Sequence, residues 1–397
     1  MGMKSKILIR ASVFSRIQRG FSLVELMIAM VIGLLMALAL IALFYKINRT
    51  NTEMAKTNSQ IENGRFALQI LAQDVTHGGF WGSYVPEFDD LTLKGTPKDA
   101  PTAVPNPCLP YSTPWTAANI ANLLGIPVQV YGETPPSGAG CVTVLSANKK
   151  AGTDVLVVRY AENCVAGSGG NCDADVAGNL YFQSSYSYRS YCASGLTADA
   201  VPYILDTTGF DTLHEKDCTT AVTAKRKFIS NIYYVRDYAK TVGDGIPTLM
   251  VTQFGLTGGV LAHQKALPLI EGIEGFRVML GIDSLSKTGA AVDYTKSIAW
   301  ADPSNYTTST NRGDGVPDGD FVSCTDTTPC TVTQLTNVTV AKLYVLARSS
   351  ATTSGYTDNK TYELGGSTLG PFNDGFKRHV FSTTVRVNNV AVRRDLP

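Results

Sequence analysis

The sequence predicts an α+β protein in which one long N-terminal helix precedes a large antiparallel β-sheet head. An uncharged run of 20 residues, 26–45, is long enough for a membrane-spanning helix. No proline occurs from residue 21 to Tyr84, so the same helix can continue well beyond that run. Many strand-like segments follow in the rest of the 397-residue chain, which is typical of antiparallel sheets packed on a helix.

The charge distribution separates the first 20 residues from the rest. That segment contains no acidic residue and five basic ones: Lys4, Lys6, Arg10, Arg16 and Arg19. Without them the chain has 29 basic and 33 acidic residues, a net charge of −4, although the whole chain carries +1. Because the phosphate backbone needs a basic surface, we expect no nucleic-acid partner.

The apolar segment 21–45 carries a single charge, Glu25. A plain signal anchor, with its basic residues in the cytoplasm, explains everything except this carboxylate. A carboxylate in a membrane helix costs about 2.5–3.5 kcal/mol and therefore usually has a partner. Cleavage between Gly20 and Phe21 would create an amine four residues before Glu25, about one helical turn away.

The residues Gly20-Phe21-Ser22-Leu23-Val24-Glu25, after a short basic leader, resemble the type IV prepilin cleavage motif. The resemblance implies that residues 1–20 are a leader removed by a prepilin peptidase, which then methylates Phe21. It also implies that Glu25 meets the N-terminal amine of a neighbouring subunit. Residues 21–45 would then span the inner membrane once, with the head in the periplasm and later on the pilus.

Residues 46–78 are predicted to form the amphipathic, periplasmic half of the helix. Apolar residues recur at every seventh position, which predicts one buried face: Ile47, Met54, Ile61, Leu68 and Val75. A coiled coil is the alternative, but it needs a second apolar position in each heptad, and most of those positions are polar. We expect the helix to end near His77, because two glycines follow.

Further segments resemble the PilW type of minor pilin. They are Ile61–Leu68 with Leu71 and Asp74, Gly78–Gly82, Leu269–Gly275, Gly281–Asp283 and Phe381–Asn389. The resemblance covers both ends and the middle of the chain, and is weakest from about residue 86 to 218 and from 284 to 330. It implies a pilin-like fold with a β-rich head, residues 79–397.

Three functional hypotheses follow. The first is a structural minor pilin that helps initiate type IV pilus assembly in a priming or tip complex, with other minor pilins, the major pilin and a tip adhesin as partners. The alternative is a J-type pseudopilin of a type II secretion system, which shares the prepilin motif. A membrane enzyme or receptor with a sugar-binding head requires Gly20 and Glu25 to be coincidental.

The head begins with a proline-rich stretch. Ten of the 18 prolines lie between Pro86 and Pro136, so this stretch should hold no long helix or central strand. The strand-like segments that follow are 142–145, 154–160, 179–191, 228–238, 247–254, 275–282, 338–347 and 379–392. The last has the clearest alternation of apolar and polar residues.

Eight cysteines form an even set without a CxxC pair: Cys108, Cys141, Cys164, Cys172, Cys192, Cys218, Cys324 and Cys330. This usage favours four structural disulfides in an oxidising compartment over a zinc site. We predict pairing between sequence neighbours, 108 with 141, 164 with 172, 192 with 218, and 324 with 330, because short closed loops suit surface insertions.

Enzymatic motifs are missing from the sequence, which contains neither HExxH nor a nucleophile elbow. We therefore expect neither catalysis nor a cofactor. His214 beside Glu215 and Asp217 is the only local acid/base cluster, and a solvated loop explains it better. Four tyrosines could form a stacking platform for sugar or single-stranded nucleic acid, although sheet packing is the simpler interpretation: Tyr181, Tyr186, Tyr188 and Tyr191.

A weak calcium candidate lies in residues 311–320. Asp314, Asp318 and Asp320 stand on a glycine-rich turn that resembles the second half of a calcium loop, and calcium needs six to eight oxygen ligands. The preceding ligand positions hold Thr310 and Arg312. A solvated Asp/Gly turn is therefore the favoured interpretation.

Overall fold

The computed structural model describes residues 20–112, 115–134, 141–145, 148–170, 172–188, 192 and 195–395. The chain forms two compact units, Met1–Ala55 and Lys56–Pro397. Helix α1 (Leu23–His77) contributes to both. It ends where the sequence predicts, and Gly79 after it takes a φ of +78°, which suits glycine.

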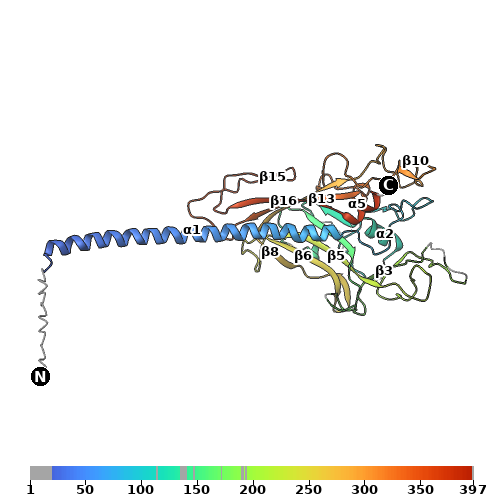
Figure 1. Ribbon diagram of the computed structural model, residues 1–397, viewed down its shortest axis with the longest axis horizontal. Helices are drawn as coiled ribbons and strands as arrows, with labels where there is room; N and C mark the ends of the chain where they lie inside the picture. Colours follow the sequence, from blue (N-terminus) through green and yellow to red (C-terminus); the bar gives the residue numbers. More distant parts are fainter. Residues whose placement is uncertain are drawn as a thin grey trace, which may run out of the picture. The chain divides into compact units, whose positions relative to one another are not determined.

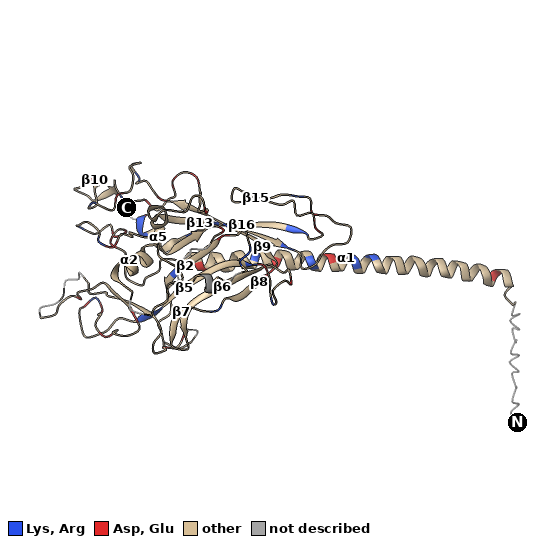
Figure 2. Ribbon diagram, turned by 180° about the vertical axis from the view of Figure 1, so that it is seen from behind, with Lys and Arg blue, Asp and Glu red and all other residues tan. Residues whose placement is uncertain are grey.

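The first unit contains the N-terminal part of α1. This part is long and apolar enough to cross a membrane. Its large apolar side chains are exposed in the isolated chain, from Phe21 (87% exposed) to Tyr45 (70% exposed). Figure 2 shows a long stretch of α1 without charge except for one acidic position near its start. Burying such a surface requires a surrounding that the single chain does not supply.

In the second unit, two antiparallel sheets lie on opposite sides of the head part of α1 (Figure 1). The larger sheet has eight strands: β1 (Val128–Tyr131), β2 (Val155–Ala161), β3 (Tyr181–Ser184), β4 (Tyr203–Asp206), β5 (Lys225–Arg236), β6 (Thr248–Thr257), β7 (Val260–His263) and β8 (Leu267–Glu271). Their order is β1-β2-β5-β3-β4, and β6 pairs with β5, β7 and β8.

The smaller sheet has the order β12-β9-β13-β16. Its strands are β9 (Ile273–Ile282), β12 (Val322–Ser323), β13 (Val338–Arg348) and β16 (Arg378–Arg386). Leu343 in the centre of β13 pairs with Val278 on one side and with Thr383 on the other. The longest strands thus form the middle of this sheet and one of its edges.

The hydrophobic core surrounds the head part of α1. Ala67, Leu71 and Val75 are fully buried and belong to one cluster with side chains of both sheets. Leu68 and Val75 come from the predicted apolar stripe, which therefore serves as the spine of the head. Helix α1 is held by apolar burial on two sides, which contributes about 25 cal/mol per Å² of apolar surface removed from water.

Shorter elements complete the second unit. The helices are α2 (Ala117–Gly125), α3 (Cys141–Val144), α4 (Val332–Thr336) and α5 (Asn388–Arg394). Two small hairpins pair β10 (Trp300–Asp302) with β11 (Thr307–Ser309) and β14 (Tyr362–Leu364) with β15 (Ser367–Leu369). In the described residues of the proline-rich stretch, the nine-residue α2 and the edge strand β1 are the only helix and strand, in agreement with its composition.

Most predicted strands are present, and three are corrected. Residues 142–145 fall in α3 and the turn after it, because the Leu145 amide donates to the Cys141 carbonyl. Of the predicted strand 179–191, residues 189–191 lie outside the described part, and the described residues form only β3. The strand predicted over 379–392 stops at Arg386, and α5 takes its second half.

Four disulfides close loops in the head. They join Cys108 to Cys141, Cys164 to Cys172, Cys192 to Cys218 and Cys324 to Cys330, the neighbour pairs expected from the sequence. The described cysteines include no free thiol. The 108–141 loop encloses α2 and β1, and the 192–218 loop encloses β4. A bridge of this kind typically stabilises a fold by roughly 2–4 kcal/mol, and less when the closed loop is short.

Candidate functional site

The start of α1 contains a reciprocal capping box. The Ser22 amide donates to Glu25 Oε2 at 3.0 Å, and the Glu25 amide donates to Ser22 Oγ at 3.2 Å. This arrangement satisfies backbone donors at the helix N-terminus, where a carboxylate is also favoured by the helix dipole. Sequence reasoning singled out Glu25 but missed Ser22, although the spacing S-x-x-E is the signature of this motif.

The capping box orients the only carboxylate of the apolar segment. Glu25 lies in the first turn of α1, next in space to the segment that holds Gly20 and Phe21. Gly20 and Phe21 precede the helix and are exposed in the single chain. Residues 1–19 of the expected leader lie outside the described residues.

At the opposite end of α1, a buried carboxylate joins the helix to the larger sheet. Asp74 accepts hydrogen bonds from the Tyr160 hydroxyl (2.6 Å), the Asn231 amide group (3.0 Å) and the Tyr233 hydroxyl (3.1 Å). Burial raises the pKa of Asp74, and these three hydrogen bonds oppose that shift. The contact fixes the rotation of α1 against β2 and β5.

Polar side chains on α1 also bind the smaller sheet. Gln60 is buried and donates to the carbonyls of Ala347 (2.7 Å) and Lys377 (3.1 Å). On the other side of the helix, Asn63 donates to the carbonyl of Glu271, the last residue of β8 in the larger sheet, at 3.0 Å. Gly64 lets the helix approach the ring of Phe381, which a Cβ at this position would overlap. The second half of α1 is therefore positioned by both sheets.

The C-terminal helix α5 caps the end of α1. The Asn389 side chain donates to the carbonyls of Thr76, His77 and Gly78, at the point where α1 ends and carbonyls lack partners within the helix. In the same helix, buried Arg394 pairs with Asp89 (2.8 Å) and Asp283 (3.2 Å). These contacts tie the end of the chain to the spine of the head.

A second buried arginine fastens the β14–β15 region to the smaller sheet. Arg378, whose side chain is fully buried, pairs with Glu274 (2.5 Å), Asp358 (2.9 Å) and Asp374 (2.7 Å). Removing one partner of such a buried network is costly, because an uncompensated charge remains. Sequence reasoning missed both arginines, since Glu274 lies 104 residues before Arg378 and Asp89 lies 305 residues before Arg394.

The calcium candidate does not assemble. Asp318 accepts the amides of Ser284 (2.8 Å) and Leu285 (2.7 Å), and Asp314 accepts the amide of Val316 (3.0 Å). Asp320 is exposed. The described residues contain no group of three or more His, Cys, Asp or Glu side chains that could hold a metal ion. These carboxylates order turns instead.

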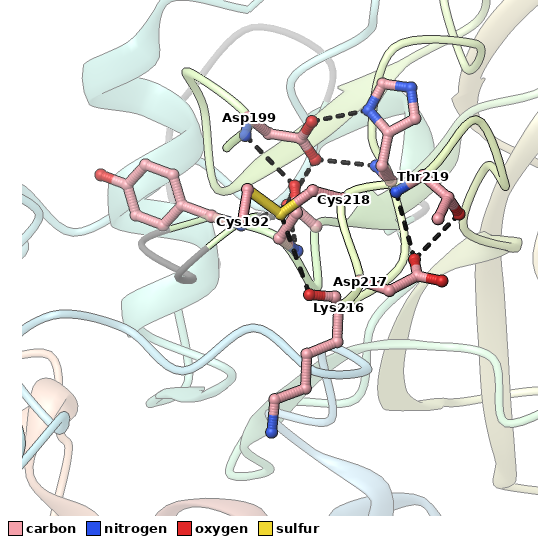
Figure 3. The surroundings of a disulfide bond; sticks show 10 residues. Cys192, Asp199, Lys216, Asp217, Cys218 and Thr219 are labelled. Carbon is pink, nitrogen blue, oxygen red and sulfur yellow. Dashed lines mark hydrogen bonds and ion pairs between the residues drawn. A yellow bond between two sulfur atoms is a disulfide. The ribbon is translucent and has the colours of Figure 1, made fainter. Parts of the chain in front are cut away.

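His214 pairs with a residue that the sequence did not indicate. Its Nδ1 lies 2.7 Å from Asp199 Oδ1, while Asp217 accepts hydrogen bonds from Thr219. Burial raises the pKa of Asp199, but hydrogen bonds from His214 and Ser185 outweigh it and bring the pKa to about 2. Figure 3 shows Asp199 and Asp217 beside the Cys192–Cys218 disulfide. The pair holds a disulfide-bonded loop.

The tyrosines do not form one platform. Tyr181 is buried against Phe210, with ring centroids 6.0 Å apart, whereas Tyr186 is 46% exposed after the end of β3. Tyr188 is half-buried, and Tyr191 lies outside the described residues. Packing within the sheet explains the first of these residues.

Comparison with known proteins points to pilins. Residues 232–389 match the family described as type IV pilus-assembly protein W, and residues 15–41 match the prokaryotic N-terminal methylation motif. The first match covers less than half of the chain and runs from within β5 through β16 to the start of α5. No curated protein matches the chain.

Among solved structures, a type IV-like pilin from Thermus thermophilus matches 83% of this chain and 96% of its own, with 12% identity and a TM-score of 0.30. The two family matches, the long apolar helix and the β-sheet head support a minor pilin of the PilW type. Such proteins have a structural role, and the methylation motif implies processing by a prepilin peptidase and association with other pilins.

Proposed function

We propose that this protein is a minor pilin that helps initiate type IV pilus assembly in a priming or tip complex. Residues 21–45 anchor it in the inner membrane, and the head lies in the periplasm, where four disulfides can form. Its partners are other minor pilins, the major pilin and a tip adhesin. The observation that carries the proposal is the processing motif at Gly20–Phe21, directly before a helix with Glu25 in its first turn.

Glu25 has two possible partners in this scheme. In the single chain its carboxylate accepts the Ser22 amide. After cleavage, the amine of a neighbouring Phe21 is the charged partner, and burying that amine without a counter-ion costs about 3–5 kcal/mol. The capping box holds the carboxylate at the end of the helix where that amine arrives.

Two substitutions separate charge pairing from capping. Glu25→Gln keeps an acceptor for the Ser22 amide but removes the charge, whereas Ser22→Ala weakens the cap and keeps the charge. We expect Glu25→Gln to give normal levels of cleaved protein, weak recovery with partner pilins and few or no surface pili. Ser22→Ala should stay close to wild type, since losing a cap costs about 1 kcal/mol.

The measurements are pilus counts, twitching and co-purification at matched expression. Wild-type piliation together with normal protein secretion in the Glu25→Gln strain would exclude the charge-pairing role. Wild-type piliation together with a loss of protein secretion in that strain would favour a J-type pseudopilin instead.

A further inference from the structure

Strand β16 is the only long strand with a free edge among the described residues. It pairs over nine residues with β13 and with no other strand. The other strands with a single partner have two to five residues, and β8 also contains Pro268 and a register shift. Proteins usually keep exposed edges short, charged or interrupted, because a long regular edge can pair with another chain.

The outward-facing backbone groups of β16 follow from its hydrogen bonds. The Val387 amide donates to the Thr339 carbonyl and the Ser349 amide donates to the Lys377 carbonyl, both at 2.8 Å. Odd-numbered residues of β16 therefore direct their amides and carbonyls to β13, and even-numbered residues direct theirs to the free edge. In the described part of the chain, no backbone hydrogen bond covers that edge.

The edge lacks the usual protection. Ser382 and Thr384 are exposed, β16 contains neither lysine nor proline, and its pairing with β13 has no bulge. Arg378 does not place a charge at the free edge, because its side chain is buried in ion pairs with Glu274, Asp358 and Asp374. Arg386 is the remaining cation on the outward face, and it lies at the end of the strand.

The direction of β16 restricts what can pair with it. Lys377 lies at Gln60, Phe381 at Gly64 and Asn389 at the end of α1, so β16 and the head part of α1 run in the same direction. Antiparallel pairing of two copies of β16 would reverse one α1 relative to the other. Two chains anchored by N-terminal helices in one membrane cannot adopt that arrangement.

We infer that the free edge of β16 binds an edge strand of a different pilin, in antiparallel pairing, through the backbone of Val380, Ser382, Thr384 and Arg386. The partner strand runs opposite to its own N-terminal helix, as β13 does in this chain, so both helices keep one direction. The inference rests on the proposed function, because that function supplies a pilin neighbour.

The test uses the full chain in its native cells, with p-benzoylphenylalanine as a photo-crosslinker in place of Thr384. Val242, 72% exposed in the segment between β5 and β6, is the control position. We expect a crosslink from position 384, and none from 242, to a protein that mass spectrometry identifies as another pilin with an N-terminal methylation motif. A crosslink to a second copy of this chain would overturn the inference.

A matched pair of variants tests the backbone itself. Thr384→Pro removes one backbone amide at the free edge, and it breaks no hydrogen bond to β13. Edge strands tolerate proline at such positions. Thr384→Val keeps the backbone amide and a β-branched side chain, so it is the matched control. Losing one hydrogen bond should reduce the recovered pilin about fivefold in the proline variant. Equal amounts of co-purified pilin from both variants would overturn the inference that the β16 edge binds a pilin, and would leave the proposed function unaffected. The same conclusion would follow if position 384 gave no crosslink while pilins still co-purified with the chain. Failure of the wild-type chain to co-purify with any pilin would overturn both.

Discussion

The Asp74 carboxylate shows how a single residue couples the spine of the head to a sheet. Burial raises its pKa, whereas hydrogen bonds from Tyr160, Asn231 and Tyr233 favour the charged form. Asn231 Oδ1 has no hydrogen-bond partner among the described atoms. If the Asn231 side-chain amide rotates by 180°, its Oδ1 can accept a hydrogen bond from the side-chain NH₂ of an asparagine at position 74. The Tyr233 hydroxyl can rotate so that its oxygen accepts the second hydrogen of that NH₂ group.

We expect Asp74→Asn to remove a pH dependence of the free energy of unfolding. The unfolded carboxyl releases its proton near the ordinary pKa of 3.8, whereas the folded one holds it to higher pH. The folded state is therefore progressively penalised as pH rises from about 4 towards neutrality. The stability of the variant relative to wild type should increase over that range in chemical unfolding of the full chain in detergent.

Asp74→Ala provides the matched control. It leaves three buried donors without an acceptor, so we expect a loss of about 3 kcal/mol at pH 7. A stability difference between Asp74→Asn and wild type that stays constant with pH would contradict the role of burial in this pKa shift.

The roles of several residues depend on partners far away in the sequence, so they could not be predicted from the neighbouring residues. Arg394 binds Asp89, 305 residues earlier, and Arg378 binds Glu274, 104 residues earlier. From the sequence alone, either arginine could equally be interpreted as a solvated surface charge. Glu25 was accessible to sequence reasoning because an isolated charge in an apolar helix is conspicuous, and Ser22 was accessible through its spacing to Glu25.

At the scale of elements, the approach of α1 to β16 depends on Gly64. A Cβ there would overlap the Phe381 ring, and overpacking typically costs about 1–3 kcal/mol. Alanine instead of glycine gains about 1 kcal/mol in a helix. We expect Gly64→Ala to lower the free energy of unfolding by about 1 kcal/mol in net terms, and the addition of Phe381→Leu to restore it.

Gly33→Ala is the control for this prediction. Gly33 lies in the same helix, and a Cβ there has no neighbour within 4 Å in the single chain. Its replacement should not lower the stability of the head in detergent. A stabilised Gly64→Ala variant would show that the ring of Phe381 moves aside at little cost.

The sequence predicted strands correctly where apolar and polar residues alternate over many positions. It predicted them wrongly where contacts with distant residues determine the secondary structure. In β16, apolar and polar residues alternate up to Val387. The buried positions then become Val390, Ala391 and Arg394, which follow a helical spacing, and Asn389 gains its partners only from the end of α1. In α3 the β-branched residues favoured a strand, but a helical turn forms beside the Cys108–Cys141 disulfide.

At the scale of the whole molecule, basic charge and exposed apolar surface lie in different segments: the basic residues precede Gly20, and the exposed apolar residues lie in the first part of α1. The apolar surface of the first unit is exposed in the single chain, whereas the second unit buries its own core. Five basic residues precede Gly20 in the segment that we propose as a leader, and they favour retention on the cytoplasmic side. In the proposed function, entry into a filament requires the helix to leave the bilayer, and an uncleaved basic segment would oppose this movement.

Cleavage after Gly20 should therefore decide whether the chain can leave the membrane. Moving a lysine or arginine through the bilayer centre costs about 2.5–3.5 kcal/mol on insertion scales, so five such residues form a large barrier, and cleavage removes all five. We expect Gly20→Val to block processing, to leave a chain that begins at Met1 in the membrane fraction, and to exclude it from sheared pili. Gly33→Ala, a glycine replacement within the same segment, should be cleaved normally and appear in pili with a methylated Phe21. N-terminal mass spectrometry of both fractions reads out each step. An uncleaved Gly20→Val chain in sheared pili would show that the leader does not retain the protein, and would separate assembly from processing.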